Sequence, residues 1–173
     1  EGSEDKSKTK PIFVWGALAG EKADVLVTKS KRGILEAVVE GVDSVKVKSP
    51  NRVEPAELEE YMSTSPWQIL DFDYENSVKL DLLKQTFKHE AGIDLGKVSP
   101  ETSMAHGDKQ YGYRNKMEYN FWGDDDGVHL ALHKRGSGQK IMLKGSVLAS
   151  DAINKAGQDI VELLNAKNVF AGD

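Results

Sequence analysis

The sequence predicts an α+β protein in which a small, partial β-barrel or curled sheet precedes an antiparallel β-sheet domain with packed helices. Residues 12–47 contain short apolar runs separated by tight turns, as in small barrels. Residues 73–91 and 149–165 carry apolar side chains at helical spacing. Residues 113–143 alternate apolar and polar side chains between turn-forming residues, which is typical of paired strands.

The N-terminal part predicts four short strands behind a polar tail. Residues 1–10 contain no apolar side chain, so we expect a flexible tail or loop there. The expected strands cover 12–15, 23–28, 33–39 and 45–48. Two prolines, Pro50 and Pro55, then mark a linker. We therefore expect a partial barrel over 11–49, a linker over 50–72 and a central α+β domain over 73–173.

Both expected helices have an apolar stripe. In 73–91, Asp73 is the expected N-cap and Gly92 the residue after the C-cap. The stripe of this helix consists of Val78, Leu82, Leu83 and Phe87. The stripe of the second helix, 149–165, consists of Ile153, Ile160, Leu163 and Leu164. Such stripes ordinarily pack on a core.

Composition excludes several classes of protein. The chain has 173 residues, of which 39% are hydrophobic and 29% charged, which is globular composition. No apolar run approaches the ~18 residues that span a bilayer. The chain has no Cys, which excludes disulfides, thiolate metal sites and cysteine nucleophiles within it. We expect a cytoplasmic protein that is a monomer and does not contact membranes.

The charges are unevenly distributed along the chain. Residues 22–52 and 109–144 each carry seven basic against four acidic residues, whereas residues 53–108 carry four basic against twelve acidic. One interpretation is ordinary solvated surface. The other is a pair of basic patches that face one polyanion, with an acidic surface elsewhere.

The expected hairpin over 113–135 concentrates the basic residues of the second patch. Placing Trp122 opposite Gly127 pairs apolar residues throughout, and it sets Lys116 opposite His133 and Arg114 opposite Arg135. Directly opposed like charges cost stability unless solvent or an anion lies between them. Arg binds phosphate well because its planar guanidinium donates two parallel hydrogen bonds.

We therefore expect a phosphate-binding face on this hairpin, flanked by aromatic rings that can stack on unpaired bases. The alternative is an exposed strand face without a ligand. The candidate RNA-binding residues are Tyr113, Arg114, Asn115, Lys116, His133, Lys134 and Arg135, with Tyr111 nearby. We expect no catalytic residue and no metal ligand in the chain.

Other candidate sites are weaker. His129 and His133 are four apart on an expected strand, where they are about 13 Å apart and cannot share a zinc ion. The run Asp124 to Asp126 lacks the alternate spacing of a calcium loop, and we expect a solvated turn. Glu57, Glu59 and Glu60 are expected to form an exposed acidic run.

The segment Tyr111-Gly-Tyr-Arg-Asn-Lys-Met-Glu-Tyr119 resembles the signature of the central domain in bacterial S-adenosylmethionine-dependent RNA (uracil-C5) methyltransferases. Leu132 to Gly136, Ser65 to Gln68 and the helix opening at Asp73 are similar to that family as well. Phe13 to Glu21 resembles the "FVPGALPGE" stretch of its TRAM domain, an OB-like barrel that binds RNA. The resemblance covers about residues 12–165, in order.

The sequence departs from that family in two ways. Many members hold a [4Fe–4S] cluster on four cysteines, and Thr64, Trp67 and Gly145 stand at three of the matching positions, so we expect no cluster. Members also continue into a catalytic domain with a Gly-rich cofactor loop, a cysteine nucleophile and a glutamate base. The chain has no Cys to add to uracil C6, so we expect it to be a piece of a longer protein.

The resemblance implies RNA, either rRNA or tRNA, as the partner, and S-adenosylmethionine as a cofactor bound by the catalytic domain. It implies that this chain is the RNA-binding front of the enzyme. A stand-alone RNA-binding or ribosome-associated module is the main alternative, and an interaction domain that does not bind nucleic acid is a third.

Overall fold

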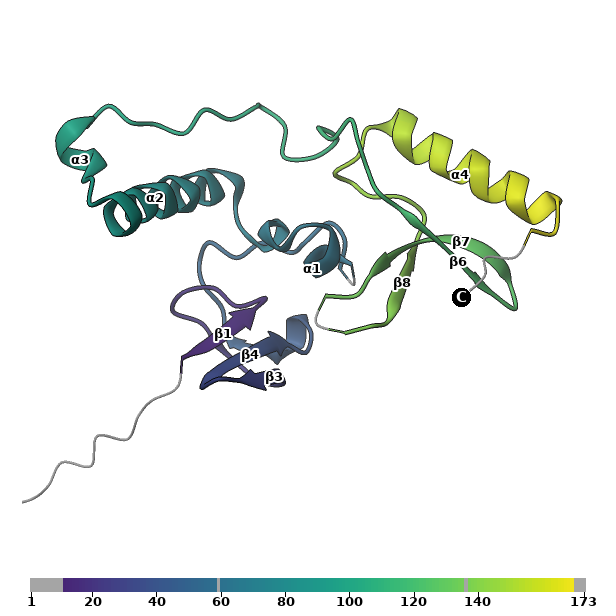
Figure 1. Ribbon diagram of the computed structural model, residues 1–173, viewed down its shortest axis with the longest axis horizontal. Helices are drawn as coiled ribbons and strands as arrows, with labels where there is room; N and C mark the ends of the chain where they lie inside the picture. The colour runs from purple at the N-terminus through teal and green to yellow at the C-terminus, as the bar shows by residue number, and fades with distance from the viewer. Residues whose placement is uncertain (1–10, 59, 136, 170–173) are drawn as a thin grey trace, which may run out of the picture. The chain divides into compact units, whose positions relative to one another are not determined.

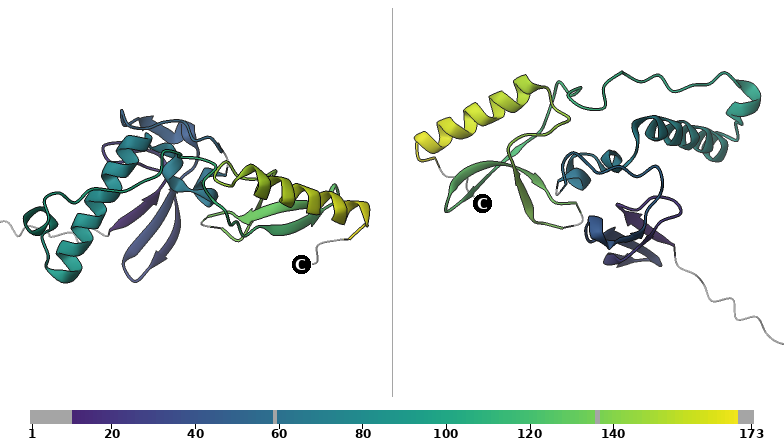
Figure 2. Two further views of the ribbon diagram at one scale, coloured as in Figure 1. Left: turned by 90° about the horizontal axis from the view of Figure 1, so that it is seen from above. Right: turned by 180° about the vertical axis from the view of Figure 1, so that it is seen from behind.

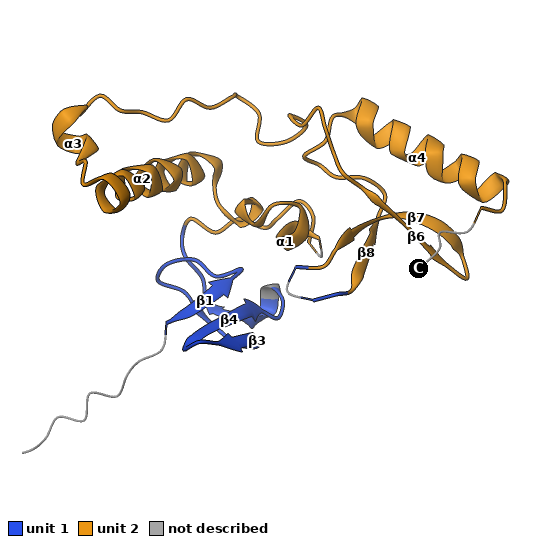
Figure 3. Ribbon diagram, in the orientation of Figure 1, with its two compact units in different colours: residues 1–50, 135–138 blue, residues 51–134, 139–173 orange. Residues whose placement is uncertain are grey.

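The computed structural model describes residues 11–58, 60–135 and 137–169. The expected tail over 1–10 lies outside the described residues. The chain divides into two units (Figure 3): unit 1 comprises residues 1–50 with 135–138, and unit 2 comprises 51–134 with 139–173. Helices and small sheets make the protein α+β, as expected from the sequence.

Unit 1 is built from short strands that mostly lie where the sequence predicts them, but the strand predicted over 23–28 is divided into two strands that belong to different sheets. Strand β1 (Ile12–Trp15) runs parallel to β4 (Ile34–Val39), and β3 (Val25–Lys31) runs antiparallel to β4 on its other side. Strand β2 (Lys22–Ala23) pairs with β5 (Val45–Val47), after the 3-10 helix η1 (Val42–Ser44). The two sheets do not close into one barrel within the described residues.

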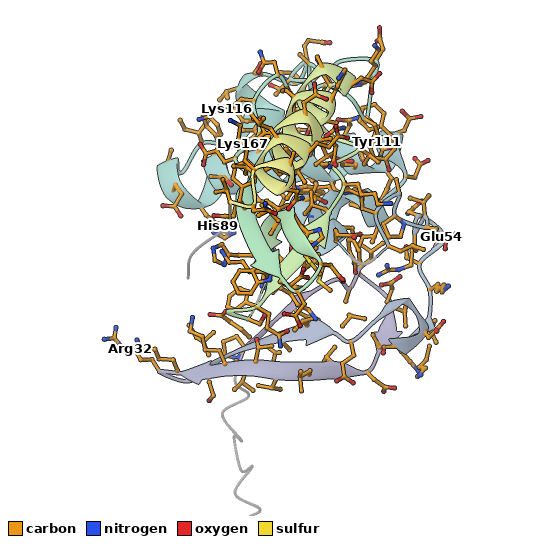
Figure 4. All side chains as sticks on the ribbon, turned by 90° about the vertical axis from the view of Figure 1, so that its right-hand side faces the viewer. Arg32, Glu54, His89, Tyr111, Lys116 and Lys167 are labelled. Atoms are coloured by element: carbon orange, nitrogen blue, oxygen red, sulfur yellow. The ribbon has the colours of Figure 1, made fainter. Side chains whose placement is uncertain are left out.

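A tight turn joins β3 to β4. Lys31 pairs with Ile34, and Arg32 and Gly33 between them have φ angles of 51° and 82°. Positive φ at both central residues is the type I′ geometry that matches strand twist. Arg32 projects at the tip of this hairpin (Figure 4).

The core of unit 1 is small. Ala37, Val39 and Val45 are buried, whereas all four side chains of β1 and all seven of β3 are exposed. The carboxylate of Glu21 fixes the connection before β2, because it accepts from the backbone N–H of Leu18 at 2.7 Å and from that of Ser49 at 3.0 Å.

Unit 2 begins with helical turns and a long helix. Helix α1 (Tyr61–Thr64) and the 3-10 helix η2 (Pro66–Ile69) lie in the segment predicted as a linker. Helix α2 (Phe72–Ala91) follows, and the short helix α3 (Leu95–Val98) comes next. From α3 the chain returns beside α2 towards the sheet without regular structure (Figure 1).

The sequence predicts the glycine at the end of helix α2 but misplaces the N-cap at its start. Gly92, expected one place after the C-cap, is itself the C-cap, and its φ of 67° is the left-handed conformation that suits glycine. The N-cap is Asp71 and not Asp73, since the Asp71 carboxylate accepts from the N–H groups of Asp73 and Tyr74. The predicted apolar stripe does not pack on a core, because Leu82, Leu83 and Phe87 are 47%, 36% and 40% exposed.

The core of unit 2 is a three-stranded antiparallel sheet covered by a helix. Its strands are β6 (Asn120–Asp124), β7 (Gly127–His133) and β8 (Lys140–Leu143), in that order, and α4 (Asp151–Ala166) packs on β7. Figure 2 shows α4 against this sheet from two further directions. Val128, Leu130 and Ala131 of the central strand are buried.

Helix α4 half-buries two residues of its predicted apolar stripe, Ile153 and Leu164, but the side that meets the sheet most closely is different. Gly157 and Val161 are buried, whereas Ile160 and Leu163 are exposed. Leu130 lies against Gly157, where a Cβ atom would stand 2.9 Å from Leu130 Cδ1. The side chain of Asn165 accepts from the N–H of Val128 at 2.7 Å and donates to its carbonyl oxygen at 3.0 Å. Small and polar residues therefore bring the helix close to the sheet.

Candidate nucleic-acid interface

The segment Tyr111–Tyr119 leads into β6 without regular structure, apart from one parallel bridge between Arg114 and Ala149, and its first residues are fixed by backbone hydrogen bonds. The N–H of Gly112 donates to the Val147 carbonyl at 2.8 Å, and the N–H of Arg114 donates to the Leu148 carbonyl at 2.9 Å. The Arg114 carbonyl accepts from the N–H of Ser150 at 3.0 Å. The Arg114 backbone is therefore held through both its N–H and its carbonyl by residues 147–150, which begin with a turn at Val147 and Leu148.

Two side chains anchor the segment 147–150 in turn. The Glu57 carboxylate accepts from the N–H of Val147 at 2.8 Å. Asn154 of α4 accepts from the N–H of Ser146 at 3.0 Å and donates to the Ser146 carbonyl at 2.9 Å. It also accepts from the Tyr119 hydroxyl at 3.1 Å. Residues distant in sequence therefore position the Arg114 backbone.

Glu57 belongs to a polar network and not to the exposed acidic run that the sequence predicts. It is half-buried and accepts from the Thr64 hydroxyl and, at 2.6 Å, from Gln68 Nε2. Its own N–H donates to Gln68 Oε1 at 3.2 Å, and Gln68 also donates to Thr64 Oγ1 at 2.9 Å. Because the Glu57 carboxylate accepts hydrogen bonds from these buried donors, they are not left unsatisfied, which would cost free energy.

Arg114 and Lys116 line one hollow of about 300 Å³, which we call the Arg114 hollow. The Arg114 guanidinium has only weak neighbours: Nη1 lies 3.9 Å from Met117 Sδ, and Cζ lies 5.9 Å from the centroid of the Tyr113 ring. Lys116 pairs with Glu118 at 2.7 Å, but the two side chains are 77% and 82% exposed. Such pairs contribute about 0–1 kcal/mol, so the lysine can exchange its carboxylate for a phosphate.

The predicted register of the hairpin is wrong by two residues. Trp122 pairs with His129, and Asp124 pairs with Gly127, so only Asp125 and Asp126 form the turn. The Asp124 carboxylate accepts from the N–H of Asp126 at 3.0 Å, which favours this shorter turn. Because the shift is two, each side chain keeps its face. The strand begins only at Asn120, so Lys116 and Arg114 are outside the ladder.

The predicted cations of the second strand therefore have other neighbours. His133 pairs with Lys140 of β8, and the lysine ammonium donates to His133 Nε2 at 3.0 Å. The N–H of Lys134 donates to the Gln139 carbonyl at 2.8 Å. Arg135 is grouped with unit 1, where its Cζ lies 4.2 Å from the centroid of the Trp15 ring. The opposed pairs Lys116–His133 and Arg114–Arg135 do not form.

Among the predicted RNA-binding residues, the structure brings together Tyr113, Arg114 and Lys116, with the exposed Asn115 between the last two. Figure 4 shows Tyr111 and Lys116, near the two ends of this segment, on opposite sides of α4 in that view. A second cavity, described below, adjoins Tyr111 and Tyr113.

Two tyrosines of the segment are held as neutral phenols. Burial, followed by the nearby carboxylate of Glu57, raises the pKa of Tyr111 and the pKa of Tyr119. Glu75 adds to the effect at Tyr111.

The other candidates have structural partners. His129 Nε2 lies 3.0 Å from the Asp124 carboxylate, and this hydrogen bond is the main cause that lowers the pKa of Asp124. Thr64, which stands where the family resemblance has a cysteine, belongs to the Glu57 network, and Gly145 lies against Asn154. Within the described ranges no group of three His, Asp or Glu side chains could hold a metal ion.

Curated relatives connect the chain with RNA methyltransferases. It is 30% identical over 164 residues to an uncharacterized RNA methyltransferase of Bacillus cereus, covering 94% of this chain and 34% of that protein. It is 30% identical over 159 residues to one of Caldanaerobacter subterraneus subsp. tengcongensis, covering 90% and 32%. For one of Halalkalibacterium halodurans, the identity is 25% over 161 residues, covering 91% and 33%.

The chain thus spans about a third of the length of the curated relatives it matches. No protein-family model matches it. In the part of the chain that the structure describes, no helix is both long and apolar enough to cross a membrane. These matches support a relationship to RNA methyltransferases.

Proposed function

We propose that this chain is the RNA-binding front of an RNA uracil-C5 methyltransferase that modifies rRNA or tRNA. The observation that carries the proposal is the Arg114 hollow. Its two cations stand on a segment whose backbone is fixed by residues 147–150, and the guanidinium has no carboxylate partner among the described residues. A guanidinium without a carboxylate partner can bind phosphate without first breaking an ion pair.

The RNA partner is supported by charge and by aromatic side chains. Residues 109–144 are net basic in a chain that is acidic overall. Tyr113 is 56% exposed beside Arg114. Exposed aromatic rings next to cations are the combination that binds unpaired nucleotides. We propose that the chain binds as a monomer, that Asn115, His133 and Lys134 of unit 2 add contacts to the RNA, and that Arg135 of unit 1 contributes a separate contact.

The uracil-C5 class is supported by the resemblance of Tyr111–Tyr119 to that signature and by relatives named RNA methyltransferases. Unit 1 would be the OB-like TRAM domain. The methyl donor, S-adenosylmethionine, would be bound by a part of the protein outside these 173 residues, since the sequence contains neither a Gly-rich cofactor loop nor a Cys. This chain would hold the RNA while that part acts on the flipped base.

Charge reversal tests the proposal. Arg114→Glu and Lys116→Glu should each weaken binding of tRNA or rRNA fragments at least tenfold, because a charge-assisted hydrogen bond contributes about 1.5–3 kcal/mol. Lys97→Glu on α3 is the matched control, since it changes the net charge equally away from the hollow. Fluorescence anisotropy gives the affinities, and circular dichroism verifies the fold. Affinities for Arg114→Glu and Lys97→Glu that agree within twofold would contradict the proposal.

The reading frame after Asp173 separates the enzyme from a stand-alone RNA-binding module. A strand–turn–helix with a Gly-rich turn, followed later by a Cys, supports the methyltransferase. A stop codon at that point supports the module. If no RNA fragment binds the chain at all, the interaction domain that does not bind nucleic acid becomes the better interpretation.

A further inference from the structure

Unit 2 contains a cavity of about 260 Å³ beside the Arg114 segment, which we call the aromatic pocket. The first turns of α2 and the 3-10 helix η2 line it on one side, and the returning chain 106–113 lines it on the other. A single ordered water needs only ~10–15 Å³ of such space, so the pocket has room for a heterocyclic ring. Its aromatic lining consists of Trp67, Phe72, Tyr111 and Tyr113.

Contacts within unit 2 hold two aromatic rings of this pocket, those of Trp67 and Phe72. Lys79 forms an ion pair with the buried Glu75, and its ammonium lies 5.2 Å from the centroid of the Trp67 ring. The ring of Phe72 meets the His106 ring edge-on, with centroids 5.5 Å apart. Rings that are already ordered bind a flat ligand without a further entropy cost.

Polar groups in the same pocket match the edge of a nucleobase. Gln110 Nε2 is buried and has no hydrogen-bond partner within the described residues. A buried donor of this kind costs about 1–3 kcal/mol when it stays unsatisfied, so a ligand oxygen or ring nitrogen fits there. The buried Asn76 donates through Nδ2 to the Phe72 carbonyl at 2.8 Å, and its Oδ1 can accept from a ligand N–H.

The aromatic pocket and the Arg114 hollow adjoin the same segment. Tyr113 lines the first and its neighbour Arg114 lines the second. The Arg114 Cζ atom lies 5.9 Å from the centroid of the Tyr113 ring, so the two side chains are direct neighbours. An RNA strand that crosses the segment can therefore place a phosphate at Arg114 and a neighbouring base in the pocket.

We propose that the aromatic pocket receives one unpaired nucleobase of the bound RNA, stacked on Tyr113 or Trp67 and hydrogen-bonded to Gln110. This inference rests on the proposed function, because the phosphate contacts at Arg114 and Lys116 bring the strand to the pocket. Lys109, which also lines the pocket, favours an anionic strand over an aromatic side chain of a protein partner, whereas the charge of Lys79 is balanced by Glu75.

The test compares the binding of two probes to the whole 173-residue chain. One is a short single-stranded RNA, and the other is the same ribose-phosphate backbone without its bases. The unmodified chain should bind the base-bearing RNA roughly 5- to 150-fold more tightly, which is the range for stacking of one base. Tyr113→Ala should lose most of that preference. Gln110→Leu should lose about 2- to 13-fold of it, as expected for one hydrogen bond.

The controls are Tyr74→Ala and Gln85→Leu on α2, neither of which lines the pocket. Both should keep the preference, whereas Arg114→Ala should weaken the binding of both probes equally. The double variant Trp15→Phe, Trp122→Phe leaves Trp67 as the only tryptophan. In this variant the base-bearing probe should quench the Trp67 fluorescence, and the abasic probe should not.

The outcomes separate the two proposals. Equal binding of the two probes by the unmodified chain, with Arg114→Ala weakening both, would overturn the pocket and leave the proposed function in place. Equal losses on both probes in Tyr113→Ala and Gln110→Leu would also overturn the pocket. No binding of either probe would overturn the proposed function and the pocket with it.

Discussion

Removing the Glu57 carboxylate tests how the candidate interface is held together. In Glu57→Ala, three donors lose an acceptor: the Val147 N–H, the Thr64 hydroxyl and Gln68 Nε2. Each hydrogen bond contributes about 1 kcal/mol net. The exposed Val147 N–H can turn to water, and Gln68 keeps Thr64 Oγ1 as an acceptor. We therefore expect a loss of about 2–3 kcal/mol in the free energy of unfolding.

The measurement is urea unfolding followed by far-ultraviolet circular dichroism, since α2 and α4 both belong to unit 2. Glu54→Ala is the matched control, because Glu54 is an exposed acid of the same segment, and it should change the free energy by less than about 0.5 kcal/mol. Glu57→Ala should also bind RNA more weakly than Glu54→Ala. Equal unfolding free energies for the two variants would refute the anchoring of segment 147–150 by Glu57.

Three further changes test the packing and the titrations. Gly157→Ala should destabilise the protein by about 1 kcal/mol, although Ala is the better helix former, because its Cβ atom meets the buried Leu130 and overpacking costs about 1–3 kcal/mol; stabilisation in thermal unfolding would contradict this. Burial raises the pKa of Tyr119, so this phenol ionises in the unfolded chain before it does in the folded one. The free energy of unfolding should therefore fall as pH rises above about 10. The unfolding free energy of Tyr119→Phe should fall less steeply, and parallel curves would exclude this cause. The hydrogen bond with His129 lowers the pKa of Asp124. The stability that Asp124 contributes should therefore be present above the ordinary pKa of 3.8 and be lost as pH falls below that value. His129→Ala should remove this part of the pH dependence of unfolding, and an unchanged pH profile would argue against the role of His129.

Much of the fold could be predicted because its signals are local. The strands of unit 1 follow from short apolar runs, and the end of α2 follows from Gly92, whose positive φ suits glycine. The start of α2 was misplaced by two residues because two aspartates, Asp71 and Asp73, can both cap. The hairpin register was misplaced because sequences that alternate strictly tolerate a shift of two without exposing their apolar face.

The site was predicted in part, for a similar reason. Arg114, Lys116 and Tyr113 are adjacent in sequence, so their proximity needed no knowledge of the fold. The anchoring groups could not be predicted, since Glu57 reaches Val147 across 90 residues and Asn154 looked like an ordinary polar position on α4. The sequence offered one signal for the contact with Asn154, which is the glycine before Ser146. In the structure Gly145 has φ of 141°, and a Cβ atom there would stand 2.6 Å from Asn154 Oδ1.

The most direct test of phosphate binding at the Arg114 hollow is the dependence of RNA affinity on salt. Each phosphate contact contributes a slope of about −0.7 for single-stranded and −0.9 for double-stranded nucleic acid in a plot of log K against log salt concentration. The double variant Arg114→Ala, Lys116→Ala should therefore give a slope shallower by about 1.5 than the unmodified chain, with its circular dichroism unchanged. An identical slope in the two proteins would show that these cations do not neutralise phosphates.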